Sequence, residues 1–143
     1  MKEFPEVESL LPHRAPFLFV EKIVEFDGRR VEASFHFDGE LPLFRGHFPG
    51  NPIVPGVIMA EALAQTSGLL LALSSKNGAG KIFYLASNNI KFVKLVRAGE
   101  TLSLKSALVR EFNGLYSFSV EALSGGAQVA AGSLVLASGK EGA

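Results

Sequence analysis

A histidine and a glutamate stand at the two ends of a proline-rich stretch, FRGHFPGNPIVPGVIMAE, which runs from Phe44 to Glu61. His47 precedes prolines at positions 49, 52 and 55, and this spacing of three matches the polyproline repeat and predicts a stiff, extended segment. A histidine held by such a segment suits a general base. The alternative is an ordinary loop histidine.

Glu61 lies one to two turns inside a predicted helix, with apolar residues on both sides in the sequence. Burying an isolated carboxylate is costly, so we expect this carboxyl to be buried and partly protonated, as a general acid requires. The alternative is a structural carboxylate, hydrogen-bonded to Gln65 one turn further on or to a distant strand. The residue alone leaves both interpretations open.

The backbone N–H groups of Gly56 and Val57 open the same helix. Unpaired donors and the helix dipole favour a developing negative charge there, and glycine allows a close approach. A thioester carbonyl needs such help because its α-proton is only weakly acidic. A base, an acid and an oxyanion site together can remove a proton beside a carbonyl and expel a β-hydroxyl as water.

The proline-rich stretch also constrains the distance between the two candidate residues. An extended segment would place His47 roughly 25 Å from the helix start at about 3.1 Å per residue. Glu61 lies about 9 Å further along the helix at roughly 1.5 Å per residue. The simplest arrangement therefore pairs His47 of one subunit with Glu61 of another.

The composition excludes several other chemistries. The chain of 143 residues has no cysteine, which removes disulfides, thiolate nucleophiles and cysteine metal sites. Its 14 basic and 14 acidic residues balance, so no global field favours nucleic acid or an anionic membrane. His13 and His36 show no metal-ligand spacing with each other or with His47. We expect neither a metal site nor a cofactor.

The most apolar segment, Val57 to Leu73, is about as long as a short membrane span. It is interrupted by Glu61, Gln65, Thr66 and Ser67, which are costly to insert in lipid. We therefore expect a helix buried in protein and no membrane span. The charged N-terminus does not have the pattern of a secretory signal, which favours a cytoplasmic protein.

The remaining elements are predicted as strands that surround this helix. Two strands form a hairpin at Asp27-Gly28, and four more follow the helix, with turns that include Asn113-Gly114 and Gly125-Gly126. The predicted strands span residues 17–26, 31–37, 81–96, 101–112, 115–123 and 128–137. This order predicts one α+β domain over residues 1–143, with a curved antiparallel sheet wrapped around one long central helix. A helix apolar on nearly every side needs that sheet or a second subunit to cover it, and we expect both.

A basic stretch follows the helix. Between residues 81 and 110 there are six basic residues against one acid, Glu100, so Lys91, Lys94 and Arg97 are candidates for docking an acidic partner. A solvated strand face has the same composition, and the sequence leaves that alternative open.

The stretch from His47 to Gln65, HFPGxPxxPGVxxxEAxAQ, closely resembles the signature of the (3R)-hydroxyacyl-acyl-carrier-protein dehydratases of the FabZ type, which have the hot-dog fold. LPHRxPF, from Leu11 to Phe17, is similar to the N-terminal motif of that family. The resemblance implies dehydration to a trans-2-enoyl product in fatty acid elongation, with His47 as the base and Glu61 as the acid, acting from two subunits.

The same resemblance assigns the other positions. It implies that Gly56, with Val57, holds the thioester carbonyl, and that Tyr84 lies beside the acyl tunnel, which we expect Phe48 and Pro55 to line as well. The implied partner is an acyl-carrier protein with a phosphopantetheine-linked acyl chain. The implied assembly is a homodimer, and further a trimer of dimers.

Two other functions fit the same fold. A hot-dog acyl thioesterase would use a carboxylate and water to hydrolyse the thioester. A non-catalytic module would bind an acyl thioester without turnover, although the His47 and Glu61 pair argues against it. A product assay separates all three.

Overall fold

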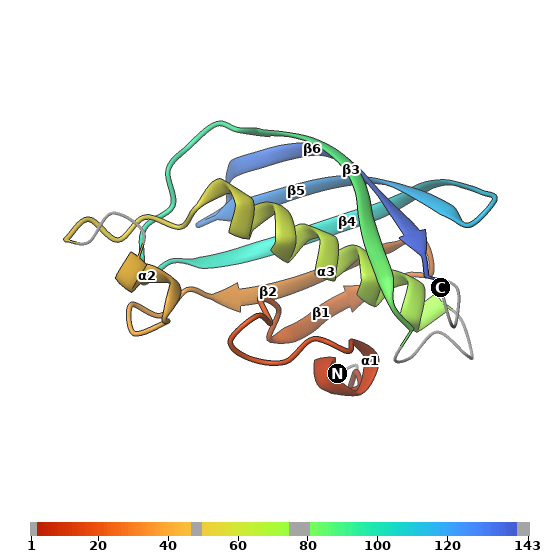
Figure 1. Ribbon diagram of the computed structural model, residues 1–143, viewed down its shortest axis with the longest axis horizontal. Coiled ribbons are helices and arrows are strands. Elements are labelled where there is room, and N and C mark those ends of the chain that lie inside the picture. The colour runs from red at the N-terminus through yellow and green to blue at the C-terminus, as the bar shows by residue number, and fades with distance from the viewer. Residues whose placement is uncertain (1–2, 47–49, 75–80, 140–143) are drawn as a thin grey trace.

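The computed structural model describes residues 3–46, 50–74 and 81–139 of the chain. Within these ranges the chain forms three helices and six strands (Figure 1). The helices are α1 (Val7–Leu10), α2 (Leu43–Gly46) and α3 (Gly56–Ser74). The strands are β1 (Lys22–Phe26), β2 (Arg30–His36), β3 (Phe83–Phe92), β4 (Thr101–Phe112), β5 (Leu115–Ser124) and β6 (Ala127–Ser138).

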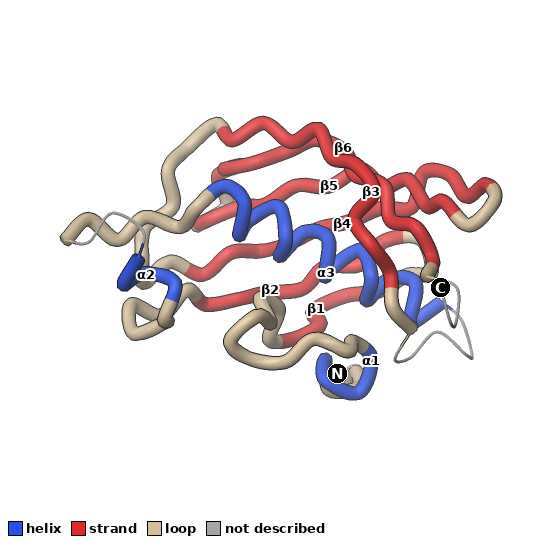
Figure 2. The backbone as a smooth tube through the Cα atoms, viewed as in Figure 1, coloured by secondary structure: helices blue, strands red, loops and turns tan. Residues whose placement is uncertain are grey.

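All six strands belong to one antiparallel sheet with the order β1-β2-β4-β5-β6-β3. The sheet curves around α3, which crosses its inner face (Figures 1 and 2). β3 lies at one edge and pairs with β6 alone among the described strands. The predicted α+β fold, a curved antiparallel sheet around one long helix, is confirmed.

The polar residues inside α3 are satisfied by hydrogen bonds within the protein. The hydroxyl of Thr66 donates to the carbonyl of Ala62 at 2.8 Å, and that of Ser67 donates to the carbonyl of Leu63 at 2.9 Å. The Ser67 hydroxyl also lies 2.7 Å from that of Ser106 on β4. By length and hydropathy α3 could cross a membrane, but 72% of its most apolar window is buried in the protein. It is the central core helix that the sequence predicts.

The first predicted strand was wrong over residues 17–21, because β1 begins only at Lys22. The backbones of Phe17 and Phe19 instead form hydrogen bonds with the Gln65 side chain. The N–H of Phe19 donates to the amide oxygen of Gln65 at 2.8 Å, and the amide nitrogen of Gln65 donates to the carbonyl of Phe17 at 3.0 Å. These hydrogen bonds replace part of the strand pairing and fasten residues 11–20, the N-terminal strap, to α3.

A short paired segment positions the start of α3. The N–H of Val54 donates to the carbonyl of Val96 at 2.7 Å, and the N–H of Ala98 donates to the carbonyl of Pro52 at 3.0 Å. Ile53 forms a bridge with Arg97 between these two bonds. The end of the predicted strand 81–96 therefore leaves the sheet and anchors the residues that lead into the helix.

Glu100 closes the loop that carries this anchor, and we expect its contribution to stability to depend on pH. Its carboxylate accepts the hydroxyl of Ser124 at 2.5 Å and the N–H of Arg97 at 2.7 Å. These bonds, that from Ser124 foremost, hold the pKa of Glu100 below its ordinary value of 4.5. A lowered folded-state pKa gives stability that is present above the unfolded-state pKa and is lost as the pH falls through the folded-state value.

Glu100→Gln is therefore expected to lower Tm at pH 7, with a gap to wild type that narrows below about pH 4. Thermal unfolding followed by circular dichroism between pH 7 and pH 3 measures this gap. A gap that stays constant over the whole range would show that the charge of Glu100 is not what stabilises the loop.

Candidate active site

Glu61 lies in the second turn of α3 with its side chain 22% exposed. Its Oε2 accepts a hydrogen bond from Nε2 of Gln65 at 3.0 Å. The expectation of a buried carboxyl was therefore too strong, since this one is half-buried and open to a neighbouring space. The hydrogen bond with Gln65 one turn further on is the contact that the structural alternative expects, so it does not by itself decide between a structural carboxylate and a general acid.

His13 comes to the same carboxylate from the N-terminal strap. Its Nε2 lies 3.7 Å from Oε2 of Glu61, and its Nδ1 is buried without a hydrogen-bond partner among the described residues. Arg14 shapes the strap by donating to the carbonyls of Leu11 and Glu8, each at 2.9 Å. Sequence analysis missed His13 as a site residue because it lies far from Glu61 along the chain. The LPHRxPF motif was the signal that could have identified it.

A small cavity of about 60 Å³ lies between the N-terminal strap, α3, β3 and β6. Glu61, His13 and Gln65 supply part of its polar lining. Lys81 adds a charged side chain, and the seven other lining residues are apolar or lack a side chain: Leu11, Pro12, Ala64, Gly68, Phe83, Leu85 and Leu136. The carboxyl of Glu61 therefore lies beside a mostly apolar space, which suits the tail of an acyl group better than a charged ligand.

The start of α3 presents backbone donors that have no partner among the residues that the structure describes. The N–H groups of Ile58 and Met59 both donate to the carbonyl of Pro55, at 3.0 and 3.1 Å. Gly56 and Val57 precede any residue that can bond within the helix, so their N–H groups are available to an oxyanion. The predicted donor pair therefore lies at a helix terminus, a little over one turn before Glu61.

Gly56 is also tightly enclosed. A Cβ atom there would lie 3.3 Å from the ring of Phe92, at the end of β3. Any other residue would require this exposed ring to shift by a few tenths of an ångström.

His47 and Phe48 lie outside the described residues, between α2 and Gly50. Their roles as base and as tunnel residue therefore stay predictions. The structure fixes the residues on either side of them, the end of α2 at Gly46 and the paired segment that begins at Pro52.

Comparison with known proteins decides the family. The model of the FabA-like domain matches residues 11–133, which include the strap, the proline-rich stretch and Glu61. The chain belongs to the FabA-like family. It is 38% identical to the 3-hydroxyacyl-[acyl-carrier-protein] dehydratase FabZ of Thiobacillus denitrificans, over 93% of this chain and 94% of that protein. It is 44% identical to the FabZ of Chloroflexus aggregans, over 80% of this chain and 81% of that one.

A solved structure supports the fold of this FabA-like chain. The dehydratase heterocomplex ApeI:P from Xenorhabdus doucetiae aligns with a TM-score of 0.85 and 20% identity, over 97% of this chain and 94% of that one. The resemblance to the hot-dog dehydratases is confirmed, and with it the enzyme class of hydro-lyases.

Tyr84 does not line the cavity beside Glu61 in this FabA-like chain. Strand alternation turns Phe83 and Leu85 toward the cavity, and Tyr84 is 57% exposed and lies against Gly139. A role in an acyl tunnel, for Tyr84 as for Pro55 before the helix, stays a prediction that a single chain does not test.

The basic candidates lie at the β3 end of the sheet. Lys91 and Lys94 are exposed, on β3 and on the loop that follows it. Arg97 donates to Oδ1 of Asn51 at 3.1 Å, which ties it to the segment that leads into α3. The two lysines are therefore better placed than Arg97 to meet a partner.

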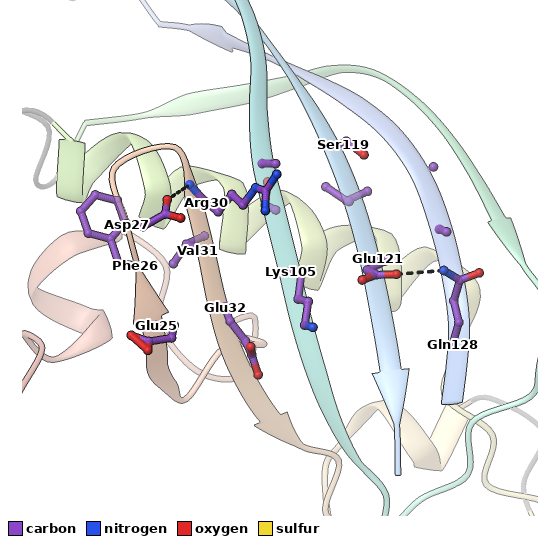
Figure 3. A pocket seen from close by; sticks show the side chains of 15 residues that line it. Glu25, Phe26, Asp27, Arg30, Val31, Glu32, Lys105, Ser119, Glu121 and Gln128 are labelled. Carbon is purple, nitrogen blue, oxygen red and sulfur yellow. Dashed lines mark hydrogen bonds between the residues drawn. The ribbon is translucent and has the colours of Figure 1, made fainter. Parts of the chain in front are cut away.

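A larger, open hollow of about 990 Å³ lies on the outer face of the sheet, away from α3 (Figure 3). Its lining is mostly polar, and Gln128 donates to Glu121 there at 2.9 Å. Among the described residues its lining contains no histidine and does not include Glu61, so the candidate acid lies elsewhere. The smaller space beside Glu61 is therefore the candidate site of this FabA-like chain.

Proposed function

We propose that the chain dehydrates (3R)-3-hydroxyacyl-acyl-carrier-protein to the trans-2-enoyl form in fatty acid elongation. The observation that carries this proposal is the Glu61 carboxyl, which lies beside an apolar cavity and follows the free N–H groups of Gly56 and Val57 on the same helix. Membership of the FabA-like family, with relatives named as dehydratases of this substrate, supports the same reaction.

In the proposed reaction His47 removes the proton at C2, and the electron pair of the broken C2–H bond forms the C2–C3 double bond. The C3–O bond breaks, Glu61 gives its proton to the departing oxygen, and water leaves. The N–H groups of Gly56 and Val57 stabilise the negative charge that develops on the thioester oxygen. His47 ends protonated and Glu61 ionised, and proton exchange with solvent restores both.

A second copy of the chain would complete this site. The outer side of β3 has no strand partner among the described residues, and large apolar side chains are exposed on it and around it. The most exposed of these are Val57 (76%), Val93 (62%), Leu95 (62%) and Tyr84 (57%). A long apolar edge strand of this kind invites pairing with another strand. We place a homodimer contact here, with a trimer of dimers as the full assembly and the cytoplasm as its location.

The deciding experiment follows the conjugated enoyl thioester by its absorbance, with a short 3-hydroxyacyl thioester as substrate. A gain of this absorbance without release of free thiol supports the dehydratase. Release of free thiol without an enoyl product would identify a thioesterase instead. Binding with neither product would identify an acyl-thioester-binding module.

We expect the exposed lysines near β3 to serve docking of the carrier protein. Lys91→Glu and Lys94→Glu should weaken use of a carrier-bound substrate more than use of a small pantetheine thioester, because charges at the rim of an interface act on encounter. The loss should shrink as salt is added. Lys22→Glu, the same change on β1 at the opposite edge of the sheet, is the control. Equal losses on both substrates would move the docking surface elsewhere.

A further inference from the structure

Gln65 is a buried side chain beside Glu61, and both its amide oxygen and its amide nitrogen have hydrogen-bond partners. It is 1% exposed, and its amide makes hydrogen bonds to three different residues. Two join it to the backbone of Phe17 and Phe19 in the N-terminal strap, and the third joins it to Oε2 of Glu61. The proposed reaction gives this residue no role.

These partners fix which way the amide faces. The N–H of Phe19 can only donate, so the group that it meets at 2.8 Å is the amide oxygen. The carbonyl of Phe17 can only accept, so the amide nitrogen faces it at 3.0 Å. An amide nitrogen carries two hydrogens, and the second one is directed to Oε2 of Glu61. The strap therefore forces Gln65 to donate to Glu61, and a flipped amide would leave both backbone groups unpaired.

The unprotonated oxygen of a carboxyl is the stronger acceptor, so this bond favours the acid proton on the other oxygen, Oε1. The Nε2 of His13 lies 3.7 Å from the same Oε2, so a second donor can face it. We infer that Gln65 is a positioning residue that confines the proton of Glu61 to Oε1 and holds this oxygen in place for the leaving hydroxyl. The inference rests on the proposed function, in which Glu61 is the acid.

Gln65→Met tests this role with two substrates that differ only in the leaving group. A 3-hydroxyacyl thioester needs a proton from Glu61 to release water, whereas the matching 3-fluoroacyl thioester releases fluoride, a weak base that needs little protonation. Both substrates lose the same C2 proton and give the same enoyl product. We expect kcat for the hydroxy substrate to fall about 10- to 100-fold with little change in KM, because positioning acts in the transition state. For the fluoro substrate we expect a loss of less than about threefold by the same reasoning.

The ratio of the two kcat values does not depend on how much of the variant is folded. It therefore separates positioning from a loss of structure. Ser67→Ala is the matched control, since it removes a buried hydrogen bond from the same helix, to Ser106 and away from Glu61. It should leave the ratio unchanged. Gln65→Asn, which keeps an amide but withdraws it from Glu61, replaces Gln65→Met if the latter fails to fold.

Equal losses on the two substrates, or no loss on either, would overturn the positioning role and leave Gln65 a structural residue. A wild-type enzyme that forms no enoyl product from the hydroxy substrate would instead refute the proposed function itself.

Discussion

Replacing Glu61 by glutamine is expected to lower dehydration by about 10²- to 10⁴-fold while the chain stays folded, because a general acid contributes about that much. Glutamine is nearly isosteric, and its amide oxygen can still accept the hydrogen bond that Gln65 donates to Glu61. It has no proton acidic enough to give to the departing hydroxyl. His47→Ala should cause a loss of the same order through the missing base.

The measurement combines turnover to the enoyl thioester with Tm for each purified variant. Glu121→Gln is the control, because it makes the same change at a carboxylate on the outer face of the sheet, where Gln128 donates to it. It should keep full activity. A Glu61→Gln or His47→Ala variant that is folded and turns over at nearly the wild-type rate would show that the role assigned to that residue is wrong.

The helix and the later strands could be predicted closely because their signals are local. The apolar run between Pro55-Gly56 and the following loop predicted a helix whose ends lie within one residue of those of α3. Asn113 and Gly114 have φ angles of 55° and 78°, and Gly125 and Gly126 have 57° and 83°. These are backbone conformations that few other residues adopt readily, so the turn pairs indicate where β4 ends, where β5 begins and ends, and where β6 begins.

The strap could not be predicted in the same way. Residues 17–21 have the composition of a strand, and what removes them from the sheet is a pair of hydrogen bonds to Gln65, more than forty residues away. His13 is equally far from Glu61 along the chain, and its place in the candidate site was missed for the same reason. By contrast, Glu61 and Gln65 are four residues apart on one helix, where side chains meet by geometry. The part of the site within α3 was therefore visible in the sequence, and the part that the strap supplies was not.

Activity should reappear when inactive His47→Ala and Glu61→Gln chains share a dimer. If each site takes His47 from one chain and Glu61 from its partner, a mixed dimer has one site with both groups and one with neither. With free exchange of equal amounts, half of the dimers are mixed, so recovery should approach about a quarter of wild-type activity. Purified mixed dimers, obtained by co-expressing two differently tagged chains, should show about half of it.

A second kind of mixed dimer is the control, because the shared site predicts that it is inactive. A wild-type chain paired with a chain that carries both substitutions has no complete shared site, because each site then lacks one of the two groups. It should be inactive, whereas sites built within one chain would leave it about half active. The two pairings contain the same substitutions in the same number, so a difference in stability cannot account for opposite outcomes. An active wild-type and double-variant pair, together with an inactive mixed pair, would place His47 and Glu61 of one chain in the same site and require the proline-rich stretch to fold back on α3.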